Sequence, residues 1–552
     1  MSTILGEISG AKLLIQCLEA HGVKRIFGIP GAKIDTVFDA IKDSSIELIL
    51  CRHEQNAAFM AAAHGRLTGE PGVVLVTSGP GVSNLATGLL TATTEGDPIV
   101  AIGGNVSRAM KLKESHQSTN NIKLLAAATK WGVEVILAKN IPEIVDNAFR
   151  IALRARRGAT FISFPQDVGY ELTDAVPHKS LLPIRQGHAP LDLIQQVAEK
   201  ISQAKLPVFI LGQEASRPEN TRAIRALLSK TKIPVVNTFQ AAGTISRELK
   251  DCFLGRVGLF KNQPGDLLID QSDLIITIGF NPAEYDPEIW NFKFNKNIVS
   301  IDYQMADIHT CYCPELELLG SISATLEQLA IYLPSRLNLP NPDLIKKLQK
   351  AHTALVTTPM PNKVHPLDFI NALRAAIDDQ TLITCDIGTN YMWMARYFYT
   401  FEPHHLLFSN GQQTLGVALP WAIAAKMAYP KKKVISISGD GGFLFSGMEL
   451  ETAVRYQQSF IHFVWDDGTY NMVKEQQLMK YHRDSGVNLG HLDLVKYAES
   501  FGAVGEVLSS ADQIPLILKK YEHHIGPVLV QVPINYHDNP ELFKMIDASE
   551  GN

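Results

Sequence analysis

Short apolar runs alternate with amphipathic helical runs in three stretches of the chain, which predicts strands separated by helices. Buried strands are expected in the first stretch at 48–51, 72–79 and 98–104. Four are expected in the second, at 207–212, 234–239, 274–279 and 297–302, and four in the third, at 382–388, 405–411, 433–441 and 460–465. Such an alternation forms parallel sheets covered by helices, so the predicted fold class is α/β with mostly parallel sheets.

Two proline-rich connections, at 167–190 and 334–366, separate the three stretches. Prolines interrupt helices and strands, so the domain boundaries are expected there. We therefore predict three domains, at 1–175, 190–335 and 365–552, each built on its own sheet. No short repeat period is present, which excludes a solenoid.

The composition is that of an ordinary globular protein. Of its 552 residues, 46% are hydrophobic and 19% are charged. The net charge of −5 gives no general attraction to nucleic acid or to an anionic membrane. The N-terminus lacks the pattern of an export signal, and no apolar run reaches the length of about eighteen residues that a membrane helix needs. We therefore expect a cytoplasmic protein that binds neither membrane nor nucleic acid.

The six cysteines are sparse for this length and form no C-x-x-C pair, which is typical of reduced thiols. The closest approach to a zinc motif is His309-x-Cys311-x-Cys313. It has no fourth ligand at a suitable spacing, so we interpret these three residues as ordinary core or surface positions.

The most informative pattern lies at 433–472. One apolar strand ends in Gly439-Asp440-Gly441-Gly442, a helical pattern follows, and a second strand ends in Asp466-Asp467-Gly468-Thr469. If the two strands are parallel neighbours, their carboxyl ends meet at one edge of the sheet, which brings Asp440 and Asp467 together. Two adjacent carboxylates need a cation, and the glycines let backbone N–H groups approach an anion. The combination suits a diphosphate held by amides and Mg²⁺.

Simpler interpretations of these features exist. The glycine motif can be only a tight strand-to-helix turn, and Asp466-Asp467 only a solvated strand exit. The pairing of carboxylates at the ends of consecutive strands is what favours a metal site. No G-x-x-x-x-G-K-[ST] motif is present, which counts against a P-loop enzyme, and 79–84 has Asn84 where a dinucleotide fingerprint has its third glycine.

The Gly-Asp-Gly motif and the Asp467-Gly468-Thr469 cluster resemble the signature of the thiamin-diphosphate enzymes. By this resemblance, Asp440, Asp467 and the main-chain oxygen of Thr469 would bind Mg²⁺. Asp467 stands where many members have Asn, which keeps an oxygen ligand and adds a negative charge. The resemblance also implies a thiamin-diphosphate-binding fold for the first and third domains.

Thiamin diphosphate requires a carboxyl group beside its aminopyrimidine ring, because proton exchange there activates the thiazolium. The segment 52–58 follows the apolar run 48–51, opens a helix at 56–67 and resembles the activating-glutamate motif of the family, with Glu54 as the glutamate. A helix N-terminus favours the ionised carboxylate and burial favours the neutral one, so burial must dominate if Glu54 is to exchange its proton. Taken alone, Glu54 can also be interpreted as an acidic residue that only stabilises the N-terminus of a helix.

The order of the motifs, with Glu54 first and Gly-Asp-Gly last, resembles the decarboxylase and acetohydroxyacid synthase branch. Chains of that branch carry a pyrimidine domain, a middle domain and a diphosphate domain in sequence. Together with these motifs, five further segments resemble the catabolic acetolactate synthases: 28–35, 78–81, 116–118, 165–168 and 409–416.

The resemblance assigns the cofactor contacts. The backbone around Gln413 and Leu415 would hydrogen-bond the aminopyrimidine, and the Leu415 side chain would keep the cofactor bent. Other expected cofactor contacts, most of them around the diphosphate, are Gly31, Ile387, Thr389, Asn390, Gly441, Gly442, Tyr470, Asn471 and Met472. Without the resemblance, Leu415 is an ordinary core residue.

The resemblance also assigns substrate contacts. Lys33, in a glycine-bounded turn beyond a strand, would anchor the substrate carboxylate, and Gln117 would donate to the reacting oxygen. Gln476 would face the substrate. With Glu54, Lys33 and Gln117 form the expected catalytic set. Without the resemblance, Lys33 is a surface lysine and Gln117 a loop glutamine.

One departure from the family concerns FAD. The anabolic acetohydroxyacid synthases bind FAD and carry an R-F-D-D-R element after a middle-domain strand that ends in Ile-Gly. Here the strand at 274–279 is followed by F-N-P-A-E-Y-D, without the arginines. A flavin diphosphate would lose its guanidinium partners, so no FAD is expected, and the central domain, although FAD-site-like in fold, is expected to be structural.

The implied reaction condenses two pyruvate molecules to 2-acetolactate with release of CO₂, in the route to acetoin and butanediol. Because Glu54 and the Gly-Asp-Gly motif lie in different domains, the resemblance implies a site between two subunits, with a homodimer as the minimal unit and a homotetramer as the assembly. Two alternatives stay open. One is a 2-oxo acid decarboxylase that releases an aldehyde, and the other is a thiamin-diphosphate-binding module without turnover.

Overall fold

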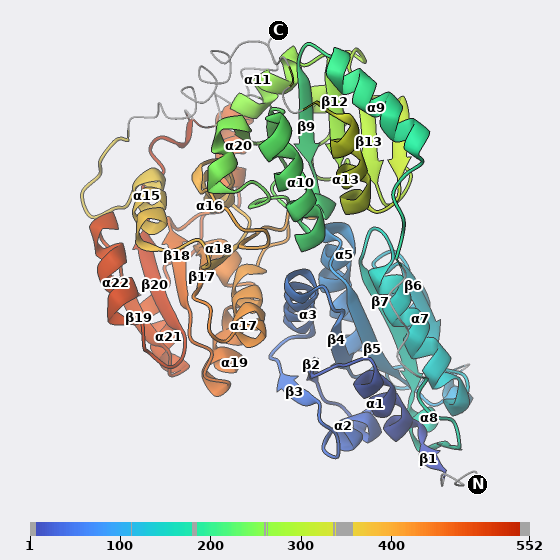
Figure 1. Ribbon diagram of the computed structural model, residues 1–552. Coiled ribbons are helices and arrows are strands. Elements are labelled where there is room, and N and C mark those ends of the chain that lie inside the picture. The colour runs from blue at the N-terminus through green and yellow to red at the C-terminus, as the bar shows by residue number, and fades with distance from the viewer. Residues whose placement is uncertain are drawn as a thin grey trace.

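The computed structural model describes residues 7–111, 113–178, 185–258, 261, 263–334, 337, 357–540 and 542. Most of the second proline-rich connection lies outside these ranges. Three six-stranded sheets, each with only parallel strand pairs, lie in three separate lobes of the structure (Figure 1). The prediction of an α/β protein with three mostly parallel sheets is therefore confirmed, whereas the boundaries at 175–190 and 335–365 stay a prediction.

The N-terminal sheet has the strand order β3-β2-β4-β5-β7-β6. Its strands are β2 (Arg25–Ile29), β3 (Glu47–Leu50), β4 (Gly72–Val76), β5 (Ile99–Asn105), β6 (Trp131–Glu134) and β7 (Ala159–Pro165). Its helices are α1 (Gly10–Ala20), α2 (Asp35–Ile41), α3 (Glu54–Thr68), α4 (Pro80–Ser83), α5 (Leu85–Glu95), α6 (Asn121–Leu125), α7 (Ile141–Leu153) and α8 (Gln166–Tyr170). A short antiparallel pair, β1 (Ile8–Ser9) with β8 (Leu172–Thr173), joins the two ends of this lobe.

The central sheet has the order β11-β10-β9-β12-β13-β14. Its strands are β9 (Pro207–Leu211), β10 (Val235–Asn237), β11 (Phe253–Arg256), β12 (Leu274–Ile278), β13 (Asn297–Asp302) and β14 (Leu316–Leu319). Its helices are α9 (Leu191–Gln203), α10 (Pro218–Thr231), α11 (Pro264–Gln271), α12 (Pro287–Trp290) and α13 (Ile322–Tyr332). The order of strand addition reverses between β9 and β12, which is where doubly wound sheets open a crevice.

The C-terminal sheet has the order β16-β15-β17-β18-β20-β19. Its strands are β15 (Leu382–Cys385), β16 (Leu406–Leu407), β17 (Val434–Gly439), β18 (Ile461–Asp466), β19 (Val504–Val507) and β20 (Val528–Pro533). Its helices are α15 (Pro366–Ala376), α16 (Thr389–Tyr397), α17 (Ala418–Ala428), α18 (Asp440–Phe443), α19 (Leu450–Arg455), α20 (Asn471–Tyr481), α21 (Leu494–Ser500) and α22 (Ile514–Lys520). Counted along the chain, this sheet and the N-terminal sheet have the same strand order.

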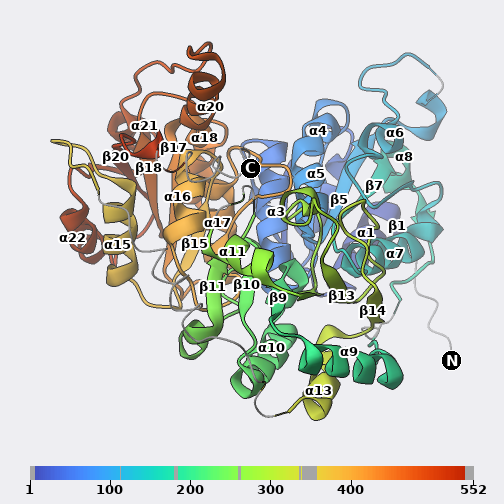
Figure 2. The same ribbon diagram turned by 90° about the horizontal axis from the view of Figure 1, so that it is seen from above.

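Helix α3 joins the N-terminal and C-terminal lobes. It lies beside α17 in two views (Figures 1 and 2), and the two helices contribute to one continuous apolar core. Alanines at 57, 58 and 61–63 of α3 are all buried. Small side chains on both helices let the two backbones approach closely, so the order of alanines in α3 fixes how the two lobes meet.

The strand predictions were incomplete, chiefly at the edges of the sheets. The edge strands β6, β11, β14 and β19 were not anticipated. β6, β14 and β19 are largely half-buried, so they lack the continuous apolar run that marks a central strand. The central or inner strands β2, β7 and β20 were also not placed, although β7 and β20 carry apolar runs.

The cysteines are free thiols, and five of the six are buried. Within the described ranges, no helix is long and apolar enough to cross a membrane.

A glycine in α3 tests the close packing of this helix. A Cβ at Gly65 would lie 2.4 Å from the carbonyl oxygen of Pro98. Alanine is the better helix former by about 1 kcal/mol, but overpacking costs about 1–3 kcal/mol. We expect Gly65→Ala to lower the melting temperature by several degrees in calorimetry. Gly490→Ala, where a Cβ meets no atom within 4 Å, is the control and should leave it unchanged. A Gly65→Ala protein as stable as the wild type would contradict the packing argument.

Candidate active site

The carboxyl ends of β17 and β18 bring the two predicted aspartates together. The strands are parallel neighbours, with Gly439 opposite Trp465. The Asp440 carboxylate accepts hydrogen bonds from the backbone N–H of Gly441 and of Gly468, both at 2.8 Å. This side chain therefore spans the exits of both strands, as the β-α-β pattern predicted.

A chain of side-chain hydrogen bonds leads from Asp467 towards α16. Thr469 Oγ1 donates to Asp467 Oδ2 at 2.6 Å, and Asn471 Nδ2 donates to the same oxygen at 3.0 Å. Asn471 Oδ1 accepts from Thr389 Oγ1 at 2.9 Å and from the buried Asn539 at 2.7 Å. Three of the predicted cofactor or metal residues, Thr389, Thr469 and Asn471, thus lie in one connected network with Asp467.

The two aspartates make this edge of the sheet strongly acidic. Burial, and then the negative charge of Asp467, raise the pKa of Asp440 to about 7. Burial also raises the pKa of Asp467. Holding two such carboxylates close together is unfavourable unless a cation or protons neutralise them. Oxygen donors of this kind suit Mg²⁺, so the residues present fit a divalent cation.

No cluster of three or more His, Cys, Asp or Glu side chains placed to bind a metal occurs in the part of the chain that the structure describes. The predicted ligand set is consistent with this result, because it contains only two carboxylates and takes its third protein ligand from the main chain. A cation held in this way would need its remaining ligands from a diphosphate and water.

Gly441 and Gly442 bring backbone close to neighbouring side chains. A Cβ at Gly441 would lie 2.6 Å from the ring of Tyr470, and one at Gly442 would lie 3.2 Å from the carboxyl carbon of Asp386. Any larger residue would therefore displace the strand exits. Both glycines lie buried at the start of α18, and the Gly441 amide already donates to Asp440.

Asp386 is a site residue that the sequence analysis did not identify. Its buried carboxylate accepts from the backbone N–H of Ile387 at 2.8 Å and of Gly416 at 2.9 Å. Burial raises its pKa to about 7. Asp386 thereby ties the turn after β15 to the residue that follows Leu415. Its signal in the sequence is an aspartate directly after the buried strand, one residue before the predicted turn.

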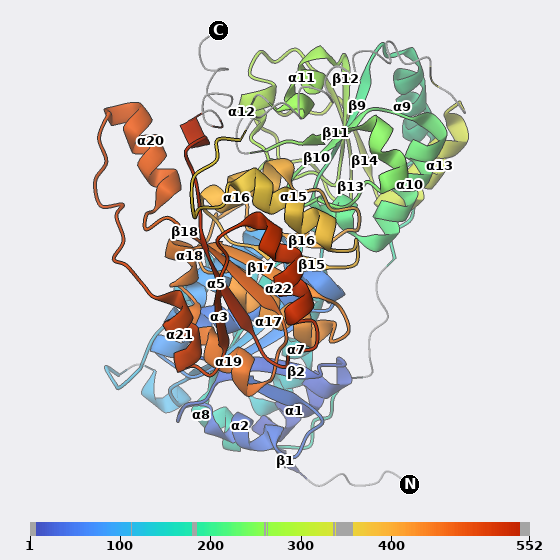
Figure 3. The ribbon, with the colours of Figure 1, turned by 90° about the vertical axis from the view of Figure 1, so that its left-hand side faces the viewer.

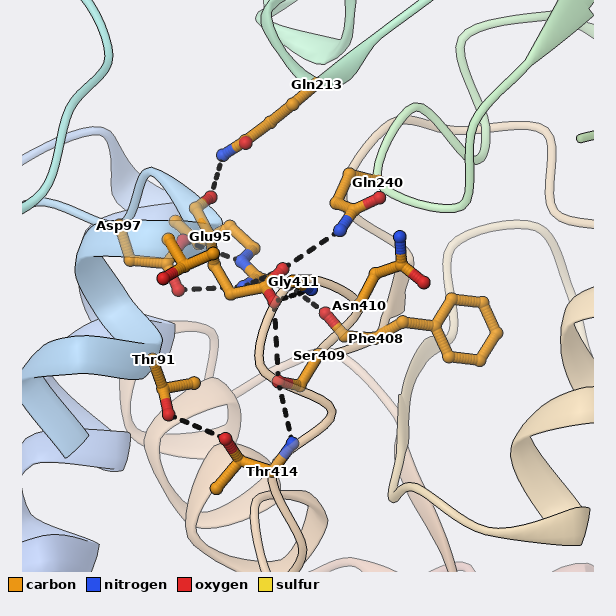
Figure 4. Close-up of polar contacts among 12 residues, drawn as sticks. Thr91, Glu95, Asp97, Gln213, Gln240, Phe408, Ser409, Asn410, Gly411 and Thr414 are labelled. Carbon is orange, nitrogen blue, oxygen red and sulfur yellow. Dashed lines mark hydrogen bonds and ion pairs between the residues drawn. The ribbon is translucent and has the colours of Figure 1, made fainter. Parts of the chain in front are cut away.

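The loop that carries Gln413 and Leu415 is held by the N-terminal lobe (Figure 4). The buried Glu95 carboxylate accepts from the backbone N–H of Gly411 at 2.7 Å and from Gln240 at 3.0 Å, while Thr91 and Thr414 share a hydrogen bond of 2.8 Å. Gln413 has a φ of +48°, an unusual conformation for a residue other than glycine. The N-terminal lobe therefore fixes this irregular loop directly, and the central lobe supports it through the Gln240 bond to Glu95.

Glu54 opens α3 at the exit of β3, two residues earlier than the helix start we expected. Its side chain is buried to 9% exposure, and its Oε2 accepts from Asn84 Nδ2 at 2.9 Å. Gly81 lies against the same carboxyl group, with its Cβ position 3.7 Å from Oε1. The carboxylate therefore has one fixed polar partner and otherwise little contact with water.

The backbone just before Glu54 is fixed by the C-terminal lobe. The buried Glu449 carboxylate accepts from the backbone N–H of Arg52 at 2.6 Å and of His53 at 3.2 Å. Burial raises the pKa of Glu449. The start of α3 is therefore positioned from both sides, by its own sheet and by the residue that precedes α19.

Gly31 and Lys33 follow β2, and Gln117, from the segment after β5, meets the exit of β4 at Ser78, on the same edge as Glu54. Gln117 has a φ of +62° and accepts from Ser78 Oγ at 2.8 Å. Lys33 Nζ is partly buried and donates to Gln166 at 3.4 Å, and Gly31 lies against the Thr77 side chain. The carboxyl edge of the N-terminal sheet thus carries a carboxylate, an ammonium and an amide.

Within one chain, the described contacts do not join this edge to the aspartates. The hydrogen bond of the Glu54 side chain stays within its own lobe, at Asn84, and the polar contacts of Asp440 and Asp467 stay within theirs. Gln476 is exposed on α20, a helix with no buried residue that stands at the edge of its lobe (Figure 3). Within one chain, the described polar contacts therefore leave these two groups of residues separate.

Three family models match this chain, and together they cover most of it. The thiamine pyrophosphate enzyme N-terminal TPP binding domain matches residues 8–125, the central domain 194–329 and the C-terminal TPP binding domain 386–532. The chain belongs to the thiamine pyrophosphate enzymes. The first and third matches contain Glu54 and the Asp440–Asp467 pair respectively.

This thiamine pyrophosphate enzyme also has close relatives. It is 52% identical to the acetolactate synthase of Bacillus subtilis (strain 168), over 97% of this chain and 94% of the relative. It is 45% identical to the catabolic acetolactate synthase of Raoultella terrigena, over 98% of both chains. Identity falls to 29% for the isozyme 2 large subunit of acetolactate synthase of Escherichia coli (strain K12), over 96% of both chains.

The central crevice of this thiamine pyrophosphate enzyme is filled by a carboxylate. At the reversal between β9 and β12, buried Glu284 accepts from the backbone N–H of Gln213 at 3.0 Å and of Asn281 at 2.9 Å, and from Thr238 Oγ1 at 2.5 Å. A Cβ at Gly212 would lie 2.4 Å from the Gly279 carbonyl oxygen. The backbone amides that follow β9 and β12 are therefore already occupied by a side chain of this chain.

Glu284 should make the stability of this enzyme depend on pH. Burial raises its pKa to about 8, against about 4.3 in an unfolded chain. The folded state binds the Glu284 proton more tightly than the unfolded state does, so proton binding stabilises the fold. This contribution to the free energy of unfolding is full below about pH 4 and is lost as the pH rises through 8. Glu284→Gln cannot lose a proton. We expect its melting temperature, relative to the wild type, to increase between pH 5 and pH 8.

The exposed Glu288 provides the control for this measurement. The difference in melting temperature between Glu288→Gln and the wild type should stay constant from pH 5 to pH 8. If the corresponding difference for Glu284→Gln also stays constant, or decreases with pH, Glu284 is ionised in the folded protein at pH 5.

Proposed function

We propose that this chain condenses two pyruvate molecules to 2-acetolactate with release of CO₂, as a catabolic acetolactate synthase in the route to acetoin. The observation that carries the proposal is the likeness to the Raoultella terrigena enzyme, which extends over 98% of both chains. The carboxylates that the reaction requires stand at the strand exits of the matched domains. The runner-up, a decarboxylase that releases an aldehyde, has no observation of its own in its favour.

The C-terminal lobe would hold thiamin diphosphate through Mg²⁺. Asp440, Asp467 and the main-chain oxygen of Thr469 would be the protein ligands of the metal. Gly441, Gly442, Ile387, Thr389, Asn390, Tyr470, Asn471 and Met472 would surround the diphosphate. The backbone fixation of Asp440 supports this assignment, because both carboxylate oxygens are already oriented by amides.

The N-terminal lobe would contribute the acid–base chemistry. When bound, thiamin diphosphate supplies a nucleophilic carbon and an electron sink for decarboxylation. Glu54 would exchange a proton with the aminopyrimidine, Lys33 would pair with the pyruvate carboxylate, and Gln117 would donate to the reacting oxygen. The low exposure of Glu54 supports its role, since proton exchange with a ring requires a carboxyl group shielded from water.

A homodimer would complete the site. Glu54 and the aspartates belong to different halves within one chain, so the Glu54 edge of one subunit would face the aspartates of the other. The exposed side chains of α20, Gln476 among them, would then meet the substrate from the diphosphate side. We extend this to a homotetramer in the cytoplasm. The filled Glu284 crevice supports a structural, FAD-free central domain.

One assay tests the proposed reaction. The purified protein is incubated with pyruvate, Mg²⁺ and thiamin diphosphate, and the product is analysed before and after acid treatment. Acetolactate, which acid converts to acetoin, is the expected product. Acetaldehyde as the main product would support the decarboxylase alternative, and no pyruvate consumption would support a module without turnover.

Replacing the proposed proton-exchange residue tests the N-terminal half of the site. Glu54→Gln keeps the shape of the side chain and the bond to Asn84 but cannot exchange a proton in the same way. We expect turnover to fall by about 10²-fold or more, the usual contribution of a positioned acid–base group. Glu47→Gln, an exposed residue of the preceding strand, is the control and should retain wild-type turnover. Equal turnover of Glu54→Gln and the control would remove Glu54 from this role.

Replacing a proposed metal ligand tests the C-terminal half of the proposed site. After EDTA treatment, activity should be lost and then restored by Mg²⁺ in the wild type. Asp440→Asn should need at least about tenfold more Mg²⁺, because even loss of an outer partner of a metal ligand weakens binding by 10- to 100-fold. Asp466→Asn, at the neighbouring position with a bond to Gln531, is the control. An unchanged Mg²⁺ requirement in Asp440→Asn would place the metal elsewhere.

A further inference from the structure

The chain segment that follows β20 lies against the proposed metal site. The backbone N–H of Ile534 donates to the carbonyl oxygen of Asp466 at 3.1 Å, so the segment leaves β20 at the exit of β18. Burial, followed by the charges of Asp467 and Asp440, raises the pKa of Tyr536. Residues near the end of the chain therefore lie close to both aspartates.

The side chain of Asn539, in the same segment, has an orientation that its neighbours fix. It is fully buried, and its Oδ1 accepts a hydrogen bond of 2.8 Å from Nε1 of the buried Trp393 on α16. An indole N–H donates and cannot accept, so the oxygen of Asn539 must face Trp393. The Asn539 Nδ2 therefore faces the other way, where it donates to Asn471 Oδ1 at 2.7 Å.

The orientation of Asn539 determines that of Asn471. Asn471 Oδ1 accepts from two donors, Asn539 Nδ2 and Thr389 Oγ1. Its Nδ2 must then face the opposite side, where it donates to Asp467 Oδ2 at 3.0 Å. A reversed Asn471 amide would place its amino group against that of Asn539 and its oxygen against the Asp467 carboxylate. Only one arrangement of the two amides therefore satisfies all these partners.

This arrangement holds the Asp467 carboxylate in place. Thr469 Oγ1 donates to the same oxygen at 2.6 Å, so two side-chain donors converge on Oδ2. Hydrogen bonds to an ionised carboxylate are stronger than those between neutral groups, and the carboxylates that bind metals are usually held by such outer partners. With Asn471 reversed, one of these two donors would become an acceptor and would repel the carboxylate.

We propose that Asn539 is a positioning residue of the metal site: through the Asn471 amide it presents an N–H group to Asp467 and holds that carboxylate in place for Mg²⁺. The inference rests on the proposed role of Asp467 as a metal ligand. Trp393 is the fixed end of this relay, because its buried ring stacks on Tyr397 at a centroid distance of 5.5 Å. The segment after β20 thus contributes to metal binding from outside the ligand set.

The test measures Mg²⁺ binding by calorimetry on the full chain, with saturating thiamin diphosphate, without pyruvate, and with a protein-free titration subtracted. Asn539→Asp keeps the shape of the side chain and still accepts from Trp393, but it cannot donate to Asn471. The Asn471 amide should then reverse, and the apparent dissociation constant of Mg²⁺ should rise about tenfold or more, as when another outer partner of a metal ligand is lost. Turnover of pyruvate at saturating Mg²⁺ should stay close to that of the wild type, because the variant weakens binding and leaves the reacting groups in place.

The direction of the change separates the proposal from two simpler explanations. If only the added charge of Asn539→Asp mattered, it would attract the cation and lower the dissociation constant. If Asn539 were purely structural, the cofactor-free variant would melt at a lower temperature than the wild type, while the dissociation constant of Mg²⁺ stayed unchanged. Either result would overturn the proposal.

Two further variants complete the test. Asn295→Asp adds the same charge at an exposed position of the central lobe and should bind Mg²⁺ as the wild type does. Trp393→Phe keeps an aromatic ring but removes the donor that orients Asn539, so it should raise the dissociation constant by a smaller factor than Asn539→Asp does. This variant also covers a failure of Asn539→Asp to fold, and an unchanged Mg²⁺ affinity in it would contradict the relay. A wild type that binds no Mg²⁺ would instead overturn the metal site itself, and with it both this inference and the proposed function.

Discussion

The packing of α3 against α17 is the contact on which the site depends. Both helices are rich in alanine, so their backbones lie close enough for one apolar core to run through two lobes. Because α3 begins at Glu54, this packing also sets where that carboxyl group stands. Glu449 adds a polar constraint, since its carboxylate fixes the two backbone amides before Glu54. The first residue of α3 is thereby held by contacts along the whole helix.

The two outer lobes use the same sheet in different ways. Each has the same relative strand order and places polar residues at its carboxyl edge, but one edge carries Glu54 and the other the Asp440–Asp467 pair. Contact through α3 and α17 leaves these edges separate within one chain. A second copy of the chain can bring an N-terminal edge to a C-terminal edge, and twofold symmetry would then generate two equivalent sites.

The sequence predicted most of the inner strands and the meeting of the Asp440 and Asp467 strand exits, because both depend on local patterns. Apolar runs mark buried strands, and the two strand exits at Asp440 and Asp467 follow from one β-α-β unit. It predicted edge strands poorly, because their residues are half-buried. It also missed Asp386, Glu95 and Glu449, whose partners lie in segments distant along the chain. A buried carboxylate that caps remote amides leaves no spacing signal.

The central lobe shows how one topology can keep its shape while its binding chemistry changes. Its strand order opens a crevice at β9 and β12, where backbone amides could hold phosphates. Glu284 takes those amides, and its raised pKa allows a neutral side chain to do so without burying a charge. Held in this way, Glu284 also ties the segments that follow β9 and β12 to each other. A phosphate group at the same amides would first have to displace this carboxyl group.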